Sequence, residues 1–488
     1  MNTAKRDIGR ISHNTKIVAT LGPGSNDVGL LEDMMRTGGL NVVRFNFSHG
    51  TAEFHAENAR IVREAAKRAG QEIAILADLQ GPKIRVGKIA GGSIELKEGE
   101  KLVLDASLEG EGTREAVGLD YRNLPDDVKA GDVLWLDDGL LTLTVDAVEG
   151  SKIITTVENS HVLKSNKGIN KRGGGLSAGA LTEKDFRDLK TAVAIGCDYL
   201  AVSFVKSAED LQLARAKVEE EMQGSQAVRP GLVAKIERVE AIENLDEIIL
   251  ASDGIMVARG DLAVEVGHAA VPALQKRMIR RARELRRFSI TATQMMESMI
   301  TNPVPTRAEV SDVANAVLDG TDAVMCSAET AVGAYPFETV TQMAIICAAA
   351  EKEQDSLNGV AEQTDEHVST NLAIAAGAVS VARAVRAKAI VTLTESGSTA
   401  FEISRHNIQL PIFALTPSVS AQRRMAMYRG VRPMILETST NHDTALAEVE
   451  ATLVAHRILS KGDQYIITSG SKMRESGSTN TLEVLSVK

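Results

Sequence analysis

Acidic and basic side chains follow short apolar runs in the first two thirds of the chain, and their types suit phosphate and metal chemistry. Lys235 and Glu237 lie two residues apart in one run, so on a β-strand both would point to the same face. Asp261 follows the next run, Gly254–Ala258. Two carboxylates brought together repel each other unless a cation lies between them, and Mg²⁺ or Mn²⁺ suits oxygen ligands. The alternative is a buried salt bridge in which Lys235 neutralises Glu237.

A second group combines basic residues with hydrogen-bonding ones. Its members are Arg44, Asn46, Ser48 and His49 after one apolar run, and Asp78, Lys83 and Arg85 after the following run. Arginine matches phosphate oxygens with a fork of donors, and lysine supplies a point charge. A lone histidine such as His49 is more often structural. So many donors nevertheless favour phosphoryl transfer, in which catalysis is mostly positioning and charge neutralisation.

Hydroxyl and carboxyl groups follow the last two runs of this kind. They are Thr293, Gln294, Ser327, Glu329 and Thr330. Hydroxyls at strand ends often satisfy only local backbone groups. Together, however, these residues could orient a water molecule that delivers a proton.

Two loops near the carboxyl terminus combine glycine with hydroxyl side chains. Thr392–Ala400 leads from an apolar run into the helix-like segment Phe401–Arg405. Such a loop at a helix amino end binds anions readily, although polar loops there are also ordinary caps. The second loop, Ser469–Thr479, carries Lys472 and Arg474, which could contact a further phosphate.

These polar residues can form one site only if the strands before them end at the same edge of a sheet or barrel. Three apolar runs lie at Thr15–Leu21, Asn41–Ser48 and Ile73–Gln80, and five more start at Asp198, Gly231, Gly254, Phe288 and Asp322. Runs that are apolar throughout are typical of parallel strands buried on both faces. Eight such strands predict an α/β fold of the (β/α)8 TIM-barrel type, in which the chemistry collects at the carboxyl ends of the strands.

The remaining segments predict two additions to this barrel. From Val86 to Lys171 apolar and polar residues alternate between turn pairs such as Asp138-Gly139, which indicates an inserted antiparallel β-rich lid. Gly173-Gly174-Gly175 is the expected return hinge. Helix–strand alternation near the end indicates a smaller α/β domain. The predicted division is residues 1–85 and 172–354 for the barrel, 86–171 for the lid and 355–488 for the C-terminal domain.

The bulk properties exclude several classes of protein. With 488 residues the chain is too long for one core, and a net charge of −10 argues against nucleic acid as a partner. The three cysteines, Cys197, Cys326 and Cys347, have no metal or disulfide spacing, so buried free thiols are expected. No stretch is apolar enough for a membrane span or a secretion signal. A cytoplasmic protein without a membrane partner is expected.

These residues together resemble pyruvate kinase over essentially the whole chain. The matching stretches are Thr15–Pro23, Asn41–Gly50, Asp78–Arg85, Val233–Glu237, Ser252–Leu262, Ala292–Met299, Pro305–Glu309 and Ser327–Thr330. The resemblance implies a barrel, a mobile β-rich lid inserted after the third strand, and a C-terminal effector domain. It also implies phosphoenolpyruvate and ADP as substrates, ATP and pyruvate as products, a Mg²⁺ or Mn²⁺ cofactor and a homotetramer.

The resemblance assigns roles residue by residue. It implies that Glu237 and Asp261 hold the divalent metal and that Lys235 stabilises the phosphoryl group in flight. The implied nucleotide and phosphate set is Arg44, Asn46, His49, Arg85 and, from the lid, Lys167. The implied substrate set is Arg44, Lys235, Thr293 and the turn Ala258, Arg259, Gly260 and Asp261. Thr293 and Ser327 would belong to the network that protonates the enolate, and Arg44 joins them and Lys235 in the catalytic set.

One departure from the family pattern concerns potassium. Family members that use K⁺ typically have a glutamate where this chain has Lys83, and Thr-Lys in place of Leu79-Gln80. The other residues of the implied monovalent-cation site, Asn46, Ser48 and Asp78, remain. An ammonium about 4 Å from an acidic group supplies about 4 kcal/mol near a surface, comparable to a bound cation. We therefore expect that K⁺ is not required.

The effector loop fits the family at Thr394, Ser396, Gly397 and Thr399, and a phosphorylated sugar or AMP is the expected effector. Two competing functions are weighed against the kinase. A metal-dependent lyase or aldolase would also stabilise an enolate but would not need the nucleotide group or the lid. A sugar-phosphate sensor using only the C-terminal domain would not need Lys235, Glu237 and Asp261.

Overall fold

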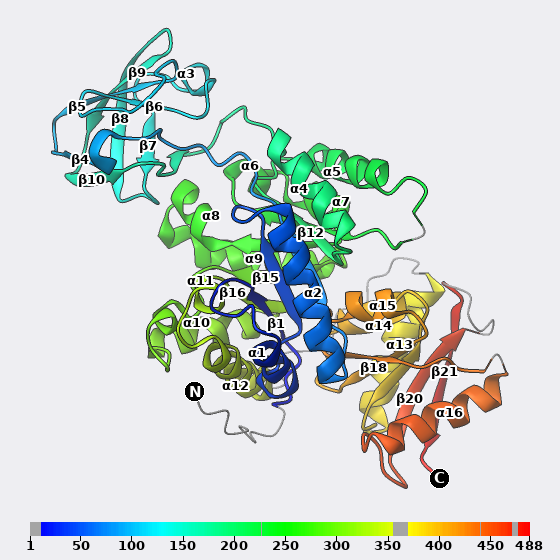
Figure 1. Cartoon of the computed structure of the whole chain (residues 1–488). Helices are drawn as coiled ribbons and strands as arrows, with labels where there is room; N and C mark the ends of the chain where they lie inside the picture. The colour runs from blue at the N-terminus through cyan, green and yellow to red at the C-terminus, as the bar shows by residue number, and fades with distance from the viewer. Residues whose placement is uncertain (1–10, 226, 355–368, 440, 471–476) are drawn as a thin grey trace.

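The centre of the molecule is a closed barrel of eight parallel strands (Figure 1). The computed structural model describes residues 11–225, 227–354, 369–439, 441–470 and 477–488. The strands pair in the order β1-β16-β15-β14-β13-β12-β3-β2. Their bounds are β1 Lys16–Thr20, β2 Val42–Asn46, β3 Ala74–Asp78, β12 Tyr199–Val202, β13 Gly231–Ile236, β14 Gly254–Ala258, β15 Phe288–Ala292 and β16 Ala323–Cys326. The predicted (β/α)8 barrel is confirmed.

Helices surround the barrel and cover the outward face of its strands. They are α1 Val28–Asp33, the π-turn Met34–Gly38, α2 Ala52–Ala69, α4 Glu183–Ala194, α5 Ala208–Glu221, α6 Val239–Glu243, α7 Leu245–Ala251, α8 Arg259–Val266, α9 Val271–Glu284, α10 Arg307–Leu318, α11 Ala328–Ala331 and α12 Pro336–Gln354, with 3₁₀ turns at His268–Ala270 and Glu297–Ile300. Two of these helices, α4 and α10, begin with capping boxes, which Thr182 and Thr306 make with Asp185 and Glu309. No helix of the described segments is long and apolar enough to cross a membrane.

Helix α10 buries only part of its apolar side chains. Val313 and Val317 are fully buried, but Val310 and Leu318 are 36% and 37% exposed. These two residues lie at the borders of the face that α10 turns toward the barrel, where a helix stripe meets the surface. The three cysteines are buried free thiols, as predicted.

The inserted lid lies on one side of the barrel and consists of two sheets (Figure 1). Its strands are β4 Ser93–Leu96, β5 Lys101–Asp105, β6 Ala116–Gly118, β7 Val133–Leu136, β8 Leu141–Glu149, β9 Lys152–Val157, β10 His161–Lys164 and β11 Ile169–Lys171, with α3 Leu124–Asp127 and a 3₁₀ turn at Ala90–Gly92. The predicted hinge contacts the barrel, since the Gly175 amide donates to Glu240 Oε1 at 2.6 Å. The exact domain boundaries stay predictions.

The C-terminal domain lies on the opposite side of the barrel from the lid (Figure 1). Its sheet has the order β19-β18-β17-β20-β21. The elements are α13 Thr370–Ala384, β17 Ile390–Leu393, α14 Ser398–Ser404, β18 Ile412–Thr416, α15 Val419–Met425, β19 Val431–Ile435, α16 His442–Ala455, β20 Gln464–Gly470 and β21 Thr479–Ser486. Met427 of this domain belongs to the apolar core inside the barrel, so the domain closes the end where the strands begin.

Candidate active site

The ammonium of Lys235 is the centre of a buried cluster at the carboxyl ends of three barrel strands. Lys235 Nζ donates to Ser203 Oγ at 2.6 Å and lies 2.9 Å from Glu237 Oε1 and 3.3 Å from Asp78 Oδ1. Both carboxylates are 1% exposed. The salt bridge considered as the alternative therefore exists, and it is part of a larger charged network.

The charges in this cluster are mutually adjusted. Burial opposes the charge on Lys235, but Asp78 and Glu237 outweigh it and hold the pKa of the ammonium above its usual value. Burial also opposes the charge on Asp78, and there Lys235 and Arg44 prevail, so the pKa of Asp78 is lowered. Burial dominates at Glu237, where Asp261 adds repulsion and the pKa of the carboxyl is raised. Lys235 and Asp78 therefore keep their charges. At Glu237 the positive charge of Lys235 does not fully offset the cost of burying the carboxylate.

Glu237 and Asp261 fit a hard divalent cation. Glu237 Oε2 accepts from the Phe204 amide at 2.7 Å. Its other oxygen, Oε1, is buried and forms an ion pair with the Lys235 ammonium at 2.9 Å. Asp261 lies in the first turn of α8, close enough for its charge to raise the pKa of Glu237. Two oxygen donors that repel each other beside an open cavity match what Mg²⁺ or Mn²⁺ requires.

Arg44 extends the cluster toward β2. Its Nε donates to Asp78 Oδ2 at 2.7 Å and its Nη1 donates to Thr20 Oγ1 at 2.9 Å. Asn46 and Ser48 lie just beyond it, and the Ser48 amide donates to Asn46 Oδ1 at 3.1 Å. His49 is exposed, and its carbonyl accepts a hydrogen bond from His55. Arg44 thus joins Lys235 through Asp78, whereas His49 forms a separate local turn.

The turn from Ala258 to Asp261 is held from the neighbouring strand. The Gly260 amide donates to Thr293 Oγ1 at 2.8 Å. Arg259 turns its guanidinium away from this turn. It forms a two-fold pair with Asp312 at 2.7 Å and donates to the Thr293 carbonyl at 2.8 Å. The Arg259 side chain therefore anchors the loop after β15, and only its backbone belongs to the substrate turn.

A cavity of about 420 Å³ connects this turn with the lid. It is lined by Gly260, Asp261 and Thr293 from the barrel, by Lys83, and by Asp138 from the lid. Lys83 Nζ lies 3.4 Å from Asp261 Oδ1. Lys83 was expected beside Asp78, but both oxygens of Asp78 already face Arg44 and Lys235. The structure accordingly places the Lys83 ammonium at the candidate metal ligand, outside ion-pair distance of Asp78.

Ser327 and Thr330 follow β16, and a buried carboxylate determines the loop between them. Glu329 is fully buried and accepts from the Ser327 amide at 2.6 Å and the Met296 amide at 3.1 Å. Thr330 Oγ1 donates to the Thr20 carbonyl at 2.9 Å. The side chains of Glu329 and Thr330 therefore form hydrogen bonds with backbone groups. For them the alternative of local backbone satisfaction holds.

Arg85 and Lys167 meet where the lid joins the barrel. The Arg85 guanidinium donates to the Asn166 carbonyl at 2.9 Å, and the Val86 amide donates to the Lys167 carbonyl at 2.9 Å. The Lys167 ammonium pairs with Asp137 of the lid at 2.8 Å. The segments that carry Arg85 and Lys167 therefore lie side by side, and the Lys167 ammonium is directed into the lid.

The candidate effector loop is ordered by its own hydroxyls. The Gly397 amide donates to Thr394 Oγ1 at 2.9 Å, and the hydroxyls of Ser396 and Ser398 lie 3.3 Å apart. Thr399 Oγ1 lies 2.7 Å from Thr479 Oγ1 of β21. Lys472 and Arg474 lie outside the described residues.

The sequence reasoning missed Ser203, Phe204 and Asp138. Ser203 is fully buried, accepts from Lys235 and donates to the Leu79 carbonyl at 2.7 Å. It follows the apolar run Tyr199–Val202, so the rule that found the other polar groups would have found it. Phe204 contributes only its backbone amide, and Asp138 reaches the cavity only because the lid folds over it. The amino-acid type of neither residue could have indicated this.

The fold and the site define a (β/α)8-barrel protein with a buried cluster of charged side chains at the carboxyl ends of its strands. Residues 12–340 match the family model described as pyruvate kinase, barrel domain, and residues 372–485 match pyruvate kinase, alpha/beta domain. The chain is 51% identical over 480 residues to pyruvate kinase II of Salmonella typhimurium, covering 97% of this chain and 98% of that protein. It is 49% identical over 473 residues to pyruvate kinase of Haemophilus influenzae, covering 96% and 97%.

A solved structure agrees with these relatives. A pyruvate kinase from Cryptosporidium parvum matches with a TM-score of 0.89 at 34% identity, covering 98% of this chain and 96% of that one. The chain therefore belongs to the pyruvate kinase family. It is a phosphotransferase of glycolysis, which passes the phosphoryl group of phosphoenolpyruvate to ADP and yields pyruvate and ATP.

Proposed function

We propose that Lys235, Glu237 and Asp261 form the centre at which the phosphoryl group is transferred. The observation that supports this most is the Lys235 ammonium, which lies within 3.3 Å of two carboxylates that are each 1% exposed. An ammonium held charged in a buried, fixed position can neutralise charge that spreads over the phosphoryl oxygens without reorganising. Arg44, fixed by Asp78, supplies a second cation on the same side.

Glu237 and Asp261 would hold Mg²⁺ or Mn²⁺. When bound, this ion neutralises oxygen charge on phosphoenolpyruvate and so makes the phosphoryl group a better electrophile. Glu237 suits the role because the Phe204 amide fixes one of its oxygens and leaves the other directed at the site. Lys83 Nζ lies 3.4 Å from Asp261 Oδ1, so a bound ion would share this carboxylate with the Lys83 ammonium.

The turn Ala258–Asp261 would hold the carboxylate of phosphoenolpyruvate. In the structure the Gly260 amide donates to Thr293 Oγ1, and the Thr293 hydroxyl donates to the Ala292 carbonyl. Binding of the carboxylate would exchange these two contacts for its oxygens. Once the phosphoryl group has left, the enolate requires a proton at its methylene carbon. Thr293 and Ser327, on adjacent strands β15 and β16, would orient the water that delivers this proton.

Asn46, His49, Arg85 and Lys167 would contact ADP together with Arg44. Lid closure would bring Lys167 onto the phosphates, exclude water, and strengthen each charge contact. Breaking the pair between Lys167 and Asp137 is the rearrangement that this closure requires.

Activity without K⁺ is also proposed. The ammonium of Lys83 is covalently attached and lies beside Asp261. It would therefore add a fixed positive charge to the same active site, at Asp261, in place of the one that a monovalent cation would bring at Asn46, Ser48, Asp78 and Leu79.

Regulation and assembly complete the proposal. A phosphorylated sugar or AMP would bind the loop of Thr394, Ser396, Gly397 and Thr399, whose hydroxyls and amides form an ordered concave turn. The protein would act as a cytoplasmic homotetramer without nucleic-acid or membrane partners.

The decisive experiment measures pyruvate formation from phosphoenolpyruvate with and without ADP, using the wild type and Lys235→Met. ADP-dependent turnover that Lys235→Met abolishes, with phosphoenolpyruvate binding retained, supports the assignment. ADP-independent cleavage would instead favour a lyase. Near-normal turnover in a folded Lys235→Met protein would remove Lys235 from the transfer step.

A further inference from the structure

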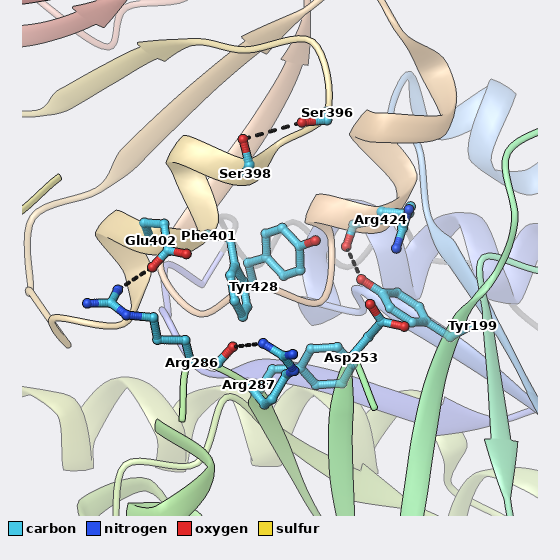
Figure 2. Close-up of a pocket in the computed structure, with 11 residues that line it drawn as sticks. Tyr199, Asp253, Arg286, Arg287, Ser396, Ser398, Phe401, Glu402, Arg424 and Tyr428 are labelled. Atoms are coloured by element: carbon cyan, nitrogen blue, oxygen red, sulfur yellow. Dashed lines mark hydrogen bonds and ion pairs between the residues drawn. The ribbon is translucent and has the colours of Figure 1, made fainter. Parts of the chain in front are cut away.

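Charges are balanced in the polar cavity of about 280 Å³ that lies between the barrel and the C-terminal domain (Figure 2). Glu402 pairs with Arg286, and the charge of Asp253 acts on Arg424. The Arg287 guanidinium donates to backbone carbonyls through each of its nitrogens. A charge balance that has to change during turnover is found instead in the lid.

Asp137, which follows β7 in the lid, holds one basic side chain on each of its carboxylate oxygens. Its Oδ1 lies 2.8 Å from the Lys167 ammonium, and its Oδ2 lies 3.0 Å from His161 Nε2. Asp137 is only 7% exposed. Burial opposes its charge, but Lys167 and His161 outweigh burial and hold the pKa of the carboxyl below its usual value. In the described part of the chain, these are the only two basic groups within ion-pair distance of Asp137.

The backbone fixes the position of Asp137 without help from the Lys167 ammonium. The Asp137 amide donates to the Gly168 carbonyl at 3.1 Å, and the Asp137 carbonyl accepts from the Leu140 amide at 3.1 Å. Asp137 and Asp138 have φ values of 53° and 56°, which belong to a tight left-handed turn. The carboxylate therefore stays in place when the Lys167 side chain moves.

Movement of Lys167 would leave Asp137 with one basic neighbour. Lid closure, as proposed above, carries the Lys167 ammonium from Asp137 to the nucleotide phosphates. A nearly buried carboxylate that loses its counterion is strongly destabilising. His161 is the remaining partner, and imidazole is the side chain that can gain a proton between pH 5 and 8. The His161 side chain is 21% exposed, so a proton from solvent can reach it.

We propose that His161 is a positioning residue for the transfer reaction, because it takes up a proton when Lys167 leaves Asp137. A carboxylate only accepts hydrogen bonds, so the neutral ring donates its Nε2–H to Asp137 and the added proton goes to Nδ1. The hydrogen bond thereby becomes an ion pair, which stabilises the closed lid. This inference rests on the proposed role of Lys167 at the nucleotide. Proton uptake and ADP binding are then linked, so each favours the other.

The other charged groups near His161 do not take part in this exchange. Side chains on β10 and its partner β4 alternate between two faces, and Glu95 and Lys164 are exposed on the face opposite His161. Asp138 is exposed and lines the active-site cavity. Lys83, which also lines that cavity, pairs with a carboxylate of the barrel. The charge on the imidazole is therefore decided by the two partners described above.

The first test compares the wild type with His161→Gln in steady-state assays that vary ADP between pH 6 and 8.5, at saturating phosphoenolpyruvate and Mg²⁺. Glutamine can still donate to Asp137 but cannot gain a proton. At pH 6 the KM for ADP should be about tenfold higher in His161→Gln, the scale of one charge-assisted hydrogen bond. At pH 8.5 the two KM values should agree, and kcat should change little throughout.

The ratio of the two KM values at each pH is the decisive quantity, because the titration of the substrates is common to both proteins and cancels. A ratio that is constant over the pH range, whether one or larger, would overturn the proposal. Asp137→Asn removes the carboxylate that attracts the proton, and in that background His161→Gln should no longer change the pH profile. His456→Gln, which removes an exposed imidazole from the C-terminal domain, is the matched control and should behave as the wild type.

Proton uptake is the second and direct measurement. Calorimetric titration of ADP with Mg²⁺ near pH 7, in buffers of different ionisation heat, gives the number of protons bound with the nucleotide. The wild type should take up more protons than His161→Gln, by at most one per site. Equal uptake by the two proteins would refute the role of His161.

Lys167→Met separates this inference from the proposed function on which it rests. An unchanged KM for ADP in Lys167→Met would refute both the nucleotide role of Lys167 and the role of His161. A raised KM in Lys167→Met, combined with a constant ratio between His161→Gln and the wild type, would refute His161 alone. A raised KM together with a ratio that grows as the pH falls supports both.

Discussion

Glu265 offers a quantitative test of how burial controls charge next to the lid hinge. This residue of α8 is 5% exposed, and its Oε2 accepts from the Val239 amide at 3.0 Å. Its own carbonyl accepts from Gly173 of the hinge. Burial raises the pKa of Glu265 from 4.5 to about 7, with Glu240 and Glu237 adding repulsion against the opposing effects of the Val239 amide and Arg238. The folded protein therefore prefers the neutral acid.

The sign of the pH effect follows from this shift. Because the pKa is higher in the folded state, the contribution of Glu265 to stability is complete below pH 4.5 and is lost as the pH rises through about 7. The shift from 4.5 to about 7 is 2.5 pH units, which corresponds to about 3 kcal/mol as an upper bound. Glu265→Gln keeps an oxygen acceptor for the Val239 amide but removes the titration. It should differ from the wild type by less than about 1 kcal/mol at pH 5 and be up to about 3 kcal/mol more stable at pH 8.

The assay is denaturant unfolding followed by circular dichroism at several pH values from 5 to 8, with a chelator present. Glu243→Gln on α6 is the matched control, because it removes the same charge from an exposed position. Its stability relative to the wild type should change little over this range. Parallel pH curves for the wild type and Glu265→Gln would show that Glu265 is not buried as described.

Four further predictions concern charged groups of the barrel, one of them the ion pair between Arg405 of the C-terminal domain and Asp322. Lys235→Met should lower kcat by at least ~10²–10³ in a coupled pyruvate assay; a folded variant with normal kcat would contradict its role. Replacing K⁺ with tetramethylammonium at saturating Mg²⁺ should leave wild-type activity nearly unchanged, whereas Lys83→Glu should create a K⁺ requirement; strong K⁺ activation of the wild type would refute this. Arg259→Gln should lower kcat/KM for phosphoenolpyruvate by up to ~10²-fold by releasing the Thr293 loop, and an unaltered value would show that the loop holds itself. Arg405→Met leaves the buried Asp322 unpaired and should cost about 3–5 kcal/mol of unfolding free energy, part of which Asp322→Asn should restore.

The barrel was predictable because its strands are buried on both faces, so each one is apolar throughout. The predicted starts at Gly231, Gly254 and Phe288 coincide with the observed strands for this reason. β19 and β21 were missed because they lie at the two edges of the C-terminal sheet and are only partly buried. Pro433 inside β19 also argues against a strand, and only an edge position tolerates it.

The site was predictable where a side chain acts and not where the backbone acts. The contacts among Lys235, Glu237 and Asp78 follow from polar residues at the carboxyl ends of β13 and β3, which are separated by β12 alone. The partner of Lys83 was not predictable, because it depends on which oxygens of Asp78 remain free in three dimensions. The contacts of the Arg259 guanidinium with Asp312 and the Thr293 carbonyl were also not predictable. An arginine at this position could equally well have bound the substrate.

Backbone strain at the rim shows what these anchors accomplish. Thr293, Gln294 and Phe204 have φ values of 72°, 51° and 54°, which bulky side chains seldom adopt. Each such residue costs of order 1–3 kcal/mol unless its surroundings hold it. Glu237 holds the Phe204 amide, and Arg259 holds the Thr293 carbonyl. Glu237 thus fixes the loop after β12 with one oxygen while directing the other at the candidate metal site. Because both tasks fall on one buried carboxylate, the geometry of the loop and the charge of the site cannot vary independently.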